Sequence, residues 1–391
     1  MVGVLYMIYN FDEIIDRKNT DCVKYDALEK YFGEVDLQPL WVADMDFKTP
    51  EVVNNAIIKR ASHGLYGYAK STEKTFFLVQ KWMKKRHNWS ISADSISFVN
   101  GVVPAYSAAI EALSDVEDEI IVQTPVYFPL FKSILENNRK LVKNPLIEKN
   151  GYYKMDLDDL KSKITKKSKI LVLCSPHNPV GRVWNKKELE ELAQICIENN
   201  ITIISDEIHA DLVFKKFTPL ASISDDIANI TLTLNSPGKT FNIAGLNCAY
   251  AICKNKNILE KFDKETKKRE INSVNVFGFV ALEAAYEFGE EWLEELLIYL
   301  EKNILFTKKY LKNNNSKVDF LEPEATYLLW LSFKKYSSQH EKVKQKLLND
   351  SKLALNDGTS FGSEGKGFFR LNCALPKADL EKALCKIVTF F

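Results

Sequence analysis

The sequence predicts an α/β protein: a large domain with a mainly parallel β-sheet sandwiched by helices, plus a smaller α+β domain. Two observations lead to this prediction. Between residues 95 and 253, short runs rich in β-branched residues alternate with helical patterns, as in a parallel sheet whose two faces are both covered. After residue 285, the residue pattern changes to that of long charged helices followed by short apolar runs.

The large domain is expected to span residues 51–285, and the small C-terminal domain residues 286–391, with residues 1–50 joining the small domain. Near-continuous apolar runs are expected to form the strands of the large domain, and amphipathic patterns its helices. The strands are expected at 95–99, 119–125, 169–176, 201–207, 229–236 and 247–253. The clearest helical patterns between them cover 101–113, 128–138 and 186–200.

Composition argues against several classes of protein. The 53 basic and 52 acidic residues leave a net charge of +1, which gives no reason to expect a nucleic-acid partner. No apolar run approaches the roughly 20 residues of a membrane-spanning helix, and the N-terminus has no basic export-signal region. Seven cysteines without a C-x-x-C pair or a histidine cluster indicate a reduced, metal-free cytoplasmic protein.

Polar and turn-forming residues follow five of the expected strands. In parallel sheets, ligands bind outside the carboxyl ends of the strands. The residues at these positions are Gly101, Pro125 to Tyr127, the segment SPHNPVGRVW (175–184), Asp206 with Glu207, and Ser236 to Lys239. The sequence therefore predicts a binding site at this edge of the sheet.

Three residues at successive strand exits, Asn178, Asp206 and Lys239, suggest one cofactor. Pyridoxal phosphate forms a Schiff base with a lysine, needs a carboxylate against its pyridine nitrogen, and needs a hydrogen bond to its phenolic oxygen. Lys239, Asp206 and Asn178 match these requirements in turn. Pro237 and Gly238 precede the lysine in a turn that would hold it inward.

The other groups that this cofactor needs are also present. The backbone N–H groups of Gly101, Val102 and Val103 open a helix after a strand and would bind the phosphate, with the Ser236 hydroxyl as a further donor. Tyr127 would stack on the pyridine ring, although an ordinary core aromatic residue is the alternative.

Arg370 is one of seven arginines in a chain with 46 lysines. It stands between two phenylalanines and the Leu371–Asn372 pair, in the segment FFRLN. The planar guanidinium fork favours bidentate binding of a carboxylate, as an amino-acid substrate would offer.

Nine segments in order resemble one family along nearly the whole chain. They are PLWVADMDF (39–47), YGY (66–68), GVVPA, TPVYFP, SPHNPVGRVW, SDEIHADL, KTFNIAGL, TYLLWL and GSEGKGFFRLN. Together they are similar to the MalY/PatB branch of the class I/II aminotransferase superfamily, pyridoxal-phosphate fold type I, whose members are cystathionine β-lyases and related carbon–sulfur lyases. The resemblance implies that Lys239 carries the cofactor, Asp206 pairs with the pyridinium, Asn178 bonds the phenolic oxygen and the substrate carboxylate, and Arg370 clamps that carboxylate.

The resemblance also implies a homodimer with shared active sites. Tyr66 would reach the phosphate of the neighbouring subunit, with Tyr68 as the alternative, and Trp41 would help to shape the substrate pocket. His209 stands where the wider superfamily commonly has a tyrosine that bonds the phenolic oxygen, so it is either a cofactor ligand or a structural histidine. Asn247 stands where many relatives keep a phosphate-binding arginine.

The activity implied by this resemblance is α,β-elimination from L-cystathionine, L-cysteine or related S-substituted cysteines, which gives a thiol, pyruvate and ammonia. An aminotransferase of the same fold is the nearest alternative, because it shares the lysine and the cofactor and differs only in the fate of the substrate carbanion. A regulator that binds a transcription factor is an alternative from another class.

Overall fold

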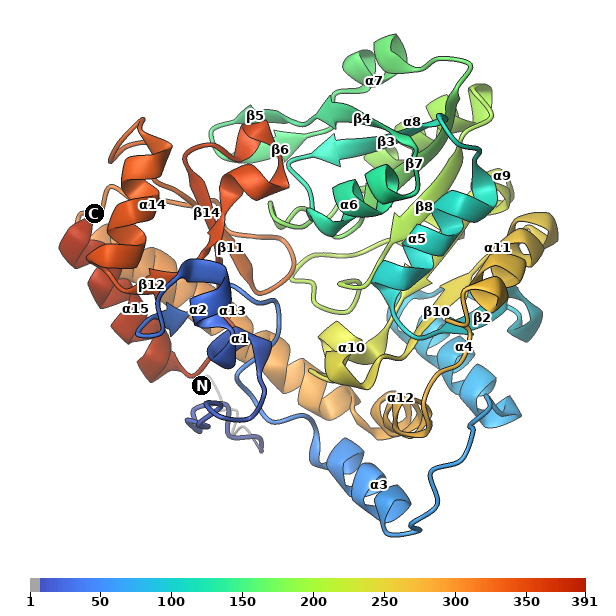
Figure 1. Cartoon of the computed structure of the whole chain (residues 1–391), viewed down its shortest axis with the longest axis horizontal. Helices are drawn as coiled ribbons and strands as arrows, with labels where there is room; N and C mark the ends of the chain where they lie inside the picture. Colours follow the sequence, from blue (N-terminus) through green and yellow to red (C-terminus); the bar gives the residue numbers. More distant parts are fainter. Residues whose placement is uncertain (1–7) are drawn as a thin grey trace, which may run out of the picture. The chain divides into compact units, whose positions relative to one another are not determined.

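The computed structural model describes residues 8–391 (Figure 1). The first seven residues lie outside the described part, so the expectation that the N-terminus carries no export signal falls partly outside it. The chain separates into two compact units. Unit 1 takes in the N-terminal segment up to Thr49, Glu290–Pro323 and Tyr327–Phe391, and unit 2 takes in Pro50–Gly289 and Glu324–Thr326.

Unit 2 is built on a seven-stranded sheet with the order β2-β10-β9-β8-β7-β3-β4. Its strands are β2 (Ile96–Val99), β3 (Glu119–Thr124), β4 (Lys140–Pro145), β7 (Ser168–Cys174), β8 (Thr202–Asp206), β9 (Thr231–Asn235) and β10 (Ala249–Ile252). Only β10 runs against its neighbours; the pairs from β9 to β4 are all parallel. The six expected strands are therefore present in a mainly parallel sheet, and β4 is an additional edge strand that the sequence interpretation missed.

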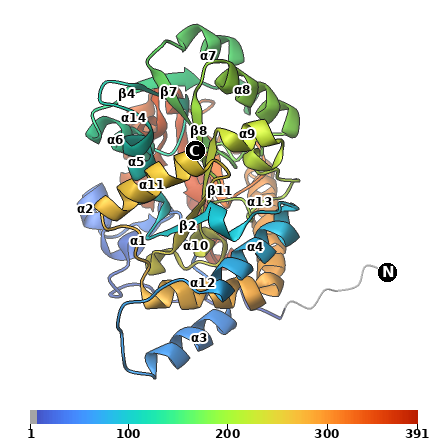
Figure 2. The ribbon, with the colours of Figure 1, turned by 90° about the vertical axis from the view of Figure 1, so that its right-hand side faces the viewer.

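Helices cover both faces of this sheet. In Figure 2, α5, α6 and α11 lie on one side of the strands, and α8 and α9 lie on the other. The bounds are α3 (Glu51–Ala61), α4 (Glu73–His87), α5 (Val102–Leu113), α6 (Pro129–Glu136), α7 (Leu157–Lys163), α8 (Lys186–Glu198), α9 (Asp225–Asn229), α10 (Pro237–Thr240), α11 (Lys256–Lys268) and α12 (Val276–Phe288). A short hairpin, β5 (Ile147–Lys149) and β6 (Tyr152–Lys154), follows β4.

The strand residues alternate between two cores, as a pleated sheet requires. Val99 and Ala249 belong to the core shared with α5 and α11. Their chain neighbours Phe98 and Tyr250 point to the opposite face, where Phe98 meets Phe279 of α12 and the Tyr250 hydroxyl lies 2.7 Å from that of Tyr286. Aromatic packing on one face and aliphatic packing on the other thus fix the position of the sheet between its helices.

Three residues from late in the chain belong to unit 2 because they pair with its loops. The Glu324 carboxylate accepts from Arg182 at 2.8 Å and from Lys215 at 2.7 Å, and Ala325 forms an antiparallel bridge with Val213. Removing one member of a buried ion pair would leave the other charge buried without a partner, which is strongly destabilising. Glu324 therefore ties this short segment to unit 2.

Unit 1 combines helices with two small sheets. Its helices are α1 (Val23–Asp26), α2 (Leu28–Phe32), α13 (Glu290–Asn313), α14 (His340–Asn349) and α15 (Lys377–Phe390). One sheet has the order β11-β14-β13, with β11 (Leu328–Ser332), β13 (Asn356–Asp357) and β14 (Phe368–Asn372); the other pairs β1 (Gln38–Pro39) with β12 (Leu353–Ala354). The β1–β12 pair joins the N-terminal segment to the C-terminal part of the chain.

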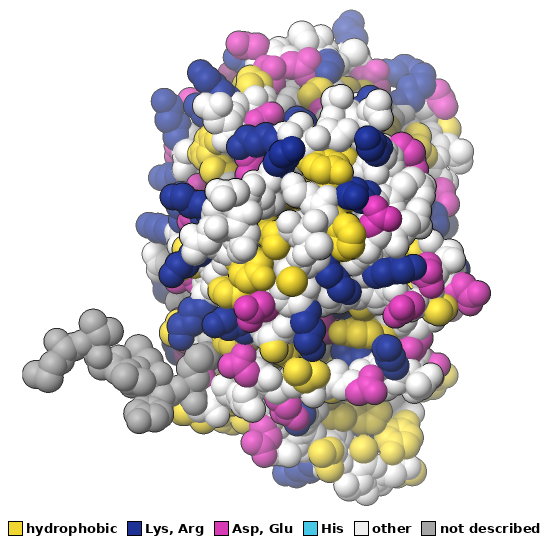
Figure 3. Space-filling model, turned by 90° about the vertical axis from the view of Figure 1, so that its left-hand side faces the viewer, with side chains coloured by type: hydrophobic (Ala, Val, Ile, Leu, Met, Phe, Trp, Pro, Cys, Tyr) yellow, Lys and Arg dark blue, Asp and Glu magenta, His cyan; other side chains and the backbone are white. Residues whose placement is uncertain are grey.

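No helix within residues 8–391 is long and apolar enough to cross a bilayer. On the face drawn in Figure 3, lysine and arginine side chains are interspersed with aspartate and glutamate. Mixed charges of this kind produce no large field of one sign on that face.

Candidate active site

Four predicted site residues leave adjacent strands of unit 2 at the same edge. Lys239 follows β9, Asp206 ends β8, Asn178 follows β7 and Tyr127 follows β3, which is also the order of these strands in the sheet. Backbone hydrogen bonds join the neighbouring exits: Glu207 N donates to Leu234 O at 2.9 Å, and Ser175 N donates to Asp206 O at 3.0 Å. The carboxyl edge of the sheet therefore presents these groups as one set.

Asp206 is the buried charge of this set. The residue is 5% exposed, and burial raises the pKa of its carboxyl group to about 6. The Ile208 N–H, which donates at 3.2 Å, and the nearby Lys239 ammonium both lower that pKa, although less than burial raises it. Because burial makes the charged form of this carboxyl group unfavourable, a cationic partner such as a protonated ring nitrogen would stabilise it.

Lys239 lies in α10, a helix of only four residues that is fixed at its first turn. The Ser236 hydroxyl accepts from Gly238 N at 2.9 Å and donates to Cys248 O at 2.6 Å. A side chain at Gly238 would place its Cβ 3.0 Å from Ser236 Oγ and 3.2 Å from Ala244 Cα, so it would fit only if these neighbours shifted. Because the Ser236 proton is already donated, this hydroxyl would have to rotate before it could donate to a phosphate.

Asn178 lies in a loop with internal support. Its backbone N–H donates to the Cys174 sulfur at 3.4 Å, and the preceding residue, His177, has its Nε2 2.8 Å from Pro125 O. Burial lowers the pKa of His177 to about 4, so the ring is neutral at neutral pH and Nε2 carries the proton that it donates. This bond joins the loop of Asn178 to the loop of Tyr127.

Several buried polar atoms near these residues have no hydrogen-bond partner among the described residues. They include the Tyr106 hydroxyl on α5, Asn100 Oδ1 after β2 and Thr124 Oγ1 at the end of β3. Burial raises the pKa of the Tyr106 hydroxyl, and electrostatic interaction with Tyr127 and Asp206 raises it further. The Tyr106 hydroxyl therefore lies near both residues. Buried polar groups without partners are rare in native proteins, so the unpartnered hydroxyl of Tyr106 near Asp206 fits a site that holds a polar ligand.

The first turn of α5 also fits an anion. Gly101, which precedes it, has φ 149° and ψ 154°, and no side chain caps this helix. Pro104 has no N–H group, and the first backbone bond into the helix comes from Ala105 to Gly101 O at 3.1 Å. The N–H groups of Val102 and Val103 therefore stand at the positive end of a 12-residue helix. Together with Asp206 and Lys239, they match the groups that pyridoxal phosphate requires.

The remaining cofactor candidates have different surroundings. His209 is buried, 3% exposed, three residues after Asp206. Tyr66 and Tyr68 lie between α3 and α4 and are 61% and 107% exposed. The Tyr66 hydroxyl donates to Ala61 O of its own chain at 3.0 Å, and its ring packs near Phe277 at 5.7 Å.

Arg370 and Trp41, the two residues expected to serve the substrate, both belong to unit 1. One Arg370 nitrogen donates to Trp41 O at 2.9 Å and to Asn356 Oδ1 at 2.6 Å. The Trp41 indole N–H donates to Lys24 O at 3.0 Å, and its ring packs against Tyr31 at 4.8 Å. Arg370 thus holds the backbone of the loop that begins at Trp41.

Glu207, directly after Asp206, leads to a prediction about pH. Burial raises the pKa of its carboxyl group to about 8, while Ser205 Oγ donates to it at 2.8 Å and Leu220 N at 3.1 Å. Between its unfolded pKa of about 4.3 and the folded value, only the folded chain keeps this proton, so stability falls as pH rises through that window.

Replacing Glu207 by glutamine keeps an oxygen for both donors and removes the ionisation. We expect the Glu207→Gln variant to gain free energy of unfolding relative to wild type, by about 1 kcal/mol for each pH unit from 5 to 8. Urea unfolding at several pH values measures this difference. A difference that stays constant with pH would show that Glu207 is ionised in the folded protein.

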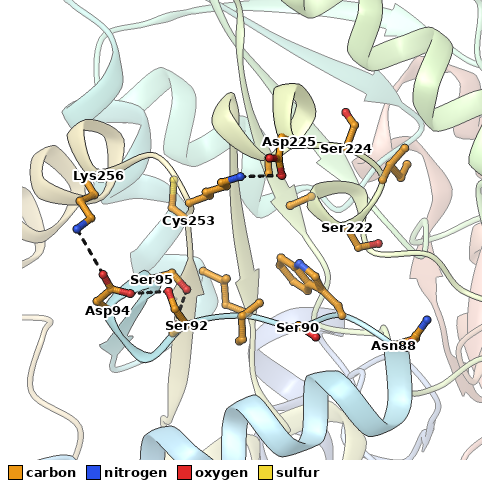
Figure 4. A pocket seen from close by; sticks show the side chains of 17 residues that line it. Asn88, Ser90, Ser92, Asp94, Ser95, Ser222, Ser224, Asp225, Cys253 and Lys256 are labelled. Atoms are coloured by element: carbon orange, nitrogen blue, oxygen red, sulfur yellow. Dashed lines mark hydrogen bonds and ion pairs between the residues drawn. The ribbon is translucent and has the colours of Figure 1, made fainter.

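A separate pocket of about 740 Å³ lies at the other edge of the sheet. It is lined by the segment before β2, by residues around the start of α9 and by the end of β10, far from the carboxyl ends of the parallel strands. Figure 4 shows the pair of Lys256 with Asp94, whose charged atoms lie 3.4 Å apart. A second pair joins Lys254 to Asp225 at 2.6 Å. Its lysines are thus neutralised, and it shares no residue with the predicted site.

Comparison with known proteins identifies the family. The pattern of the aminotransferase class I and II family matches residues 38–387. Cystathionine beta-lyase PatB of Bacillus subtilis is 41% identical over 97% of this chain and 98% of its own, and protein MalY of Escherichia coli is 31% identical over the same shares. The crystal structure of cystalysin from Treponema denticola, which contains a pyridoxal 5′-phosphate cofactor, superimposes with a TM-score of 0.95 at 35% identity and covers 98% of both chains.

These matches extend over nearly the whole chain. They confirm the fold class and the family resemblance expected from the sequence. The chain belongs to the aminotransferase class I and II family.

Proposed function

We propose that this protein is a pyridoxal-phosphate-dependent carbon–sulfur β-lyase that cleaves L-cystathionine, and also L-cysteine or related S-substituted cysteines, to a thiol, pyruvate and ammonia. The observation that carries the proposal is that Lys239 and the buried carboxylate of Asp206 leave adjacent strands and lie close enough for Lys239 to lower the pKa of Asp206. It occurs in a chain that is 41% identical to a cystathionine beta-lyase along its length.

Each site residue of unit 2 has its own role in binding the cofactor. Lys239 binds it covalently, Asp206 keeps a proton on its pyridine nitrogen, and Asn178 donates to its phenolic oxygen, with His209 as a second candidate there. Tyr127 covers the ring. When bound, pyridoxal phosphate withdraws electrons from the substrate Cα and so stabilises negative charge there.

The phosphate has its own group of ligands. The N–H groups of Gly101, Val102 and Val103 receive it at the start of α5, and the Ser236 hydroxyl joins them after rotation from Cys248 O. Helix N-termini suit such an anion because their N–H groups have no partner within the helix.

Substrate recognition falls to the two residues of unit 1. Arg370 binds the substrate carboxylate through its guanidinium, and Trp41 shapes the pocket for the sulfur-bearing chain. Lys239 would also be the base that takes the Cα proton. The Cβ–S bond then breaks, the thiolate leaves with the bonding electron pair, and the remaining three-carbon fragment is hydrolysed to pyruvate and ammonia.

The functional unit we propose is a homodimer in the cytoplasm. The exposure of Tyr66 supports this, because an aromatic side chain that is 61% exposed is available to a second subunit. Tyr66, or Tyr68 in its place, would contribute its hydroxyl to the phosphate of the partner.

A product assay without any keto-acid acceptor tests the function. Purified protein loaded with pyridoxal phosphate is mixed with L-cystathionine, and pyruvate and free thiol are followed together. Equal amounts of both are expected, in many turnovers per chain. A keto acid that forms only when an acceptor keto acid is supplied would identify an aminotransferase instead. Absence of both reactions, with L-cysteine as well, would favour the regulatory role.

A further inference from the structure

A second buried aspartate lies beneath the lysine turn and has no part in the proposed chemistry. Asp211 is 1% exposed and accepts hydrogen bonds from three side chains. His87 Nε2 lies 2.9 Å from Oδ1, the Trp82 indole N–H donates at 3.1 Å to Oδ2, and the Thr240 hydroxyl donates to Oδ2 at 3.0 Å. Thr240 is the residue directly after Lys239.

The surroundings of Asp211 are rigid. Trp82 and His87 both belong to α4, and the Trp82 ring stacks on Tyr286 of α12 with centroids 4.7 Å apart and an interplanar angle of 3°. Burial by itself raises the pKa of Asp211, but the hydrogen bond from His87 and the nearby basic groups outweigh burial and lower that pKa. The carboxylate therefore keeps its charge and accepts strongly. Asp211 is therefore a fixed acceptor, bound directly by two side chains of α4, one of which packs on α12.

The helix that carries Lys239 depends on such external anchors. A helix of four residues makes too few internal hydrogen bonds to be stable by itself. Its start is fixed by the Ser236 hydroxyl, and its last residue by the bond from Thr240 to Asp211. Successive helical residues point about 100° apart, so anchoring the buried Thr240 side chain sets the direction in which Lys239 leaves the helix.

We propose that Asp211, through the Thr240 hydroxyl, is a positioning residue that holds the Lys239 amine in the direction from which it binds the cofactor. This inference rests on the proposed function, since it assigns a role toward pyridoxal phosphate. The described contacts of Asp211 join α4 to α10, and none of them involves the four strand-exit residues.

The chain offers a conservative variant and a matched control. The Thr240→Val variant keeps the shape and removes the hydroxyl, whereas the Thr240→Ser variant keeps the hydroxyl. Thr231 in β9 is equally buried, at 0% exposed, and its hydroxyl donates at 2.7 Å to Ile227 O, far along the strand from Lys239. The Thr231→Val variant therefore loses one buried side-chain hydrogen bond of unit 2 without touching the lysine turn.

The first measurement is the rate at which apo-protein captures pyridoxal phosphate, followed by the absorbance band of the lysine-bound cofactor. We expect the Thr240→Val variant to capture it about tenfold more slowly or worse, as for the loss of one hydrogen bond to a charged group. The Thr240→Ser and Thr231→Val variants should match wild type. Equal rates in the Thr240→Val and Thr231→Val variants would overturn the proposal.

Hydrogen exchange of the apo-protein gives a readout without the cofactor. The amides of residues 238–243 should exchange faster in the Thr240→Val variant than in wild type, and should be unchanged in the Thr231→Val variant; unchanged exchange in both would refute the anchoring role. If wild type captures no pyridoxal phosphate at all, the proposed function fails first, and the role of Asp211 toward the cofactor fails with it.

Discussion

Replacing Lys239 by arginine is expected to abolish pyruvate formation from L-cystathionine, by about four orders of magnitude or more. Arginine keeps a positive charge beside Asp206, but its guanidinium neither forms a Schiff base nor gives up a proton near neutral pH. The variant should also lack the absorbance band of a lysine-bound cofactor. Steady-state release of pyruvate and the absorption spectrum measure the two effects.

The control for this variant is the same substitution at a surface lysine. Lys254 is half exposed and forms an ion pair with Asp225 in the separate pocket. A Lys254→Arg variant should retain full activity. Near-normal elimination by the Lys239→Arg variant would mean that another amine carries the cofactor.

Replacing Asp206 by asparagine is expected to change activity and stability in opposite directions. The folded carboxyl group has its pKa raised to about 6 by burial, in spite of the nearby Lys239. At pH 7.5 the folded apo-protein therefore carries a charge that it holds less readily than the unfolded chain does. Asparagine keeps an acceptor for the Ile208 N–H and removes this cost, so the apo-variant should gain about 1–3 kcal/mol in free energy of unfolding.

The same change should lower elimination by about two to four orders of magnitude, because a neutral amide does not hold the proton on the pyridine nitrogen. Urea unfolding of the apo-protein measures the change in stability, and kcat of the loaded enzyme measures the change in activity. An Asp206→Asn variant that lost stability and kept its activity would show that Asp206 is a structural residue. Opposite changes are typical of functional sites that carry strain or unfavourable charge.

The strands, and the strand exits that carry the proposed site, were predictable from local sequence. Apolar β-branched runs such as 169–176 indicate buried parallel strands, and the rule that ligands bind at their carboxyl ends then brings Asn178, Asp206 and Lys239 to one edge. The edge strand β4 was missed because its sequence, KLVKNP, mixes charge and proline with few apolar residues. The reversed direction of β10 has no local signal, because strand polarity is set by the connections and the neighbouring strands.

The site residues that depend on distant partners were not predictable. Tyr106 lies inside an apolar helix, and only the folded chain brings its hydroxyl near Asp206. Asp211 lies in a segment quoted for its family resemblance, yet its partners Trp82 and His87 are 129 and 124 residues away. A carboxylate that accepts hydrogen bonds from three side chains on two separate helices leaves no pattern in any short stretch of sequence.

The central claim is that the strand exits of unit 2 form one cofactor site around Lys239. Reducing the loaded protein with borohydride, digesting it and locating the pyridoxyl group by mass spectrometry tests this claim most directly. The account predicts one modified lysine per chain, Lys239, in the peptide that contains Pro237 and Gly238. Modification at another lysine, or spread over many surface lysines, would contradict it.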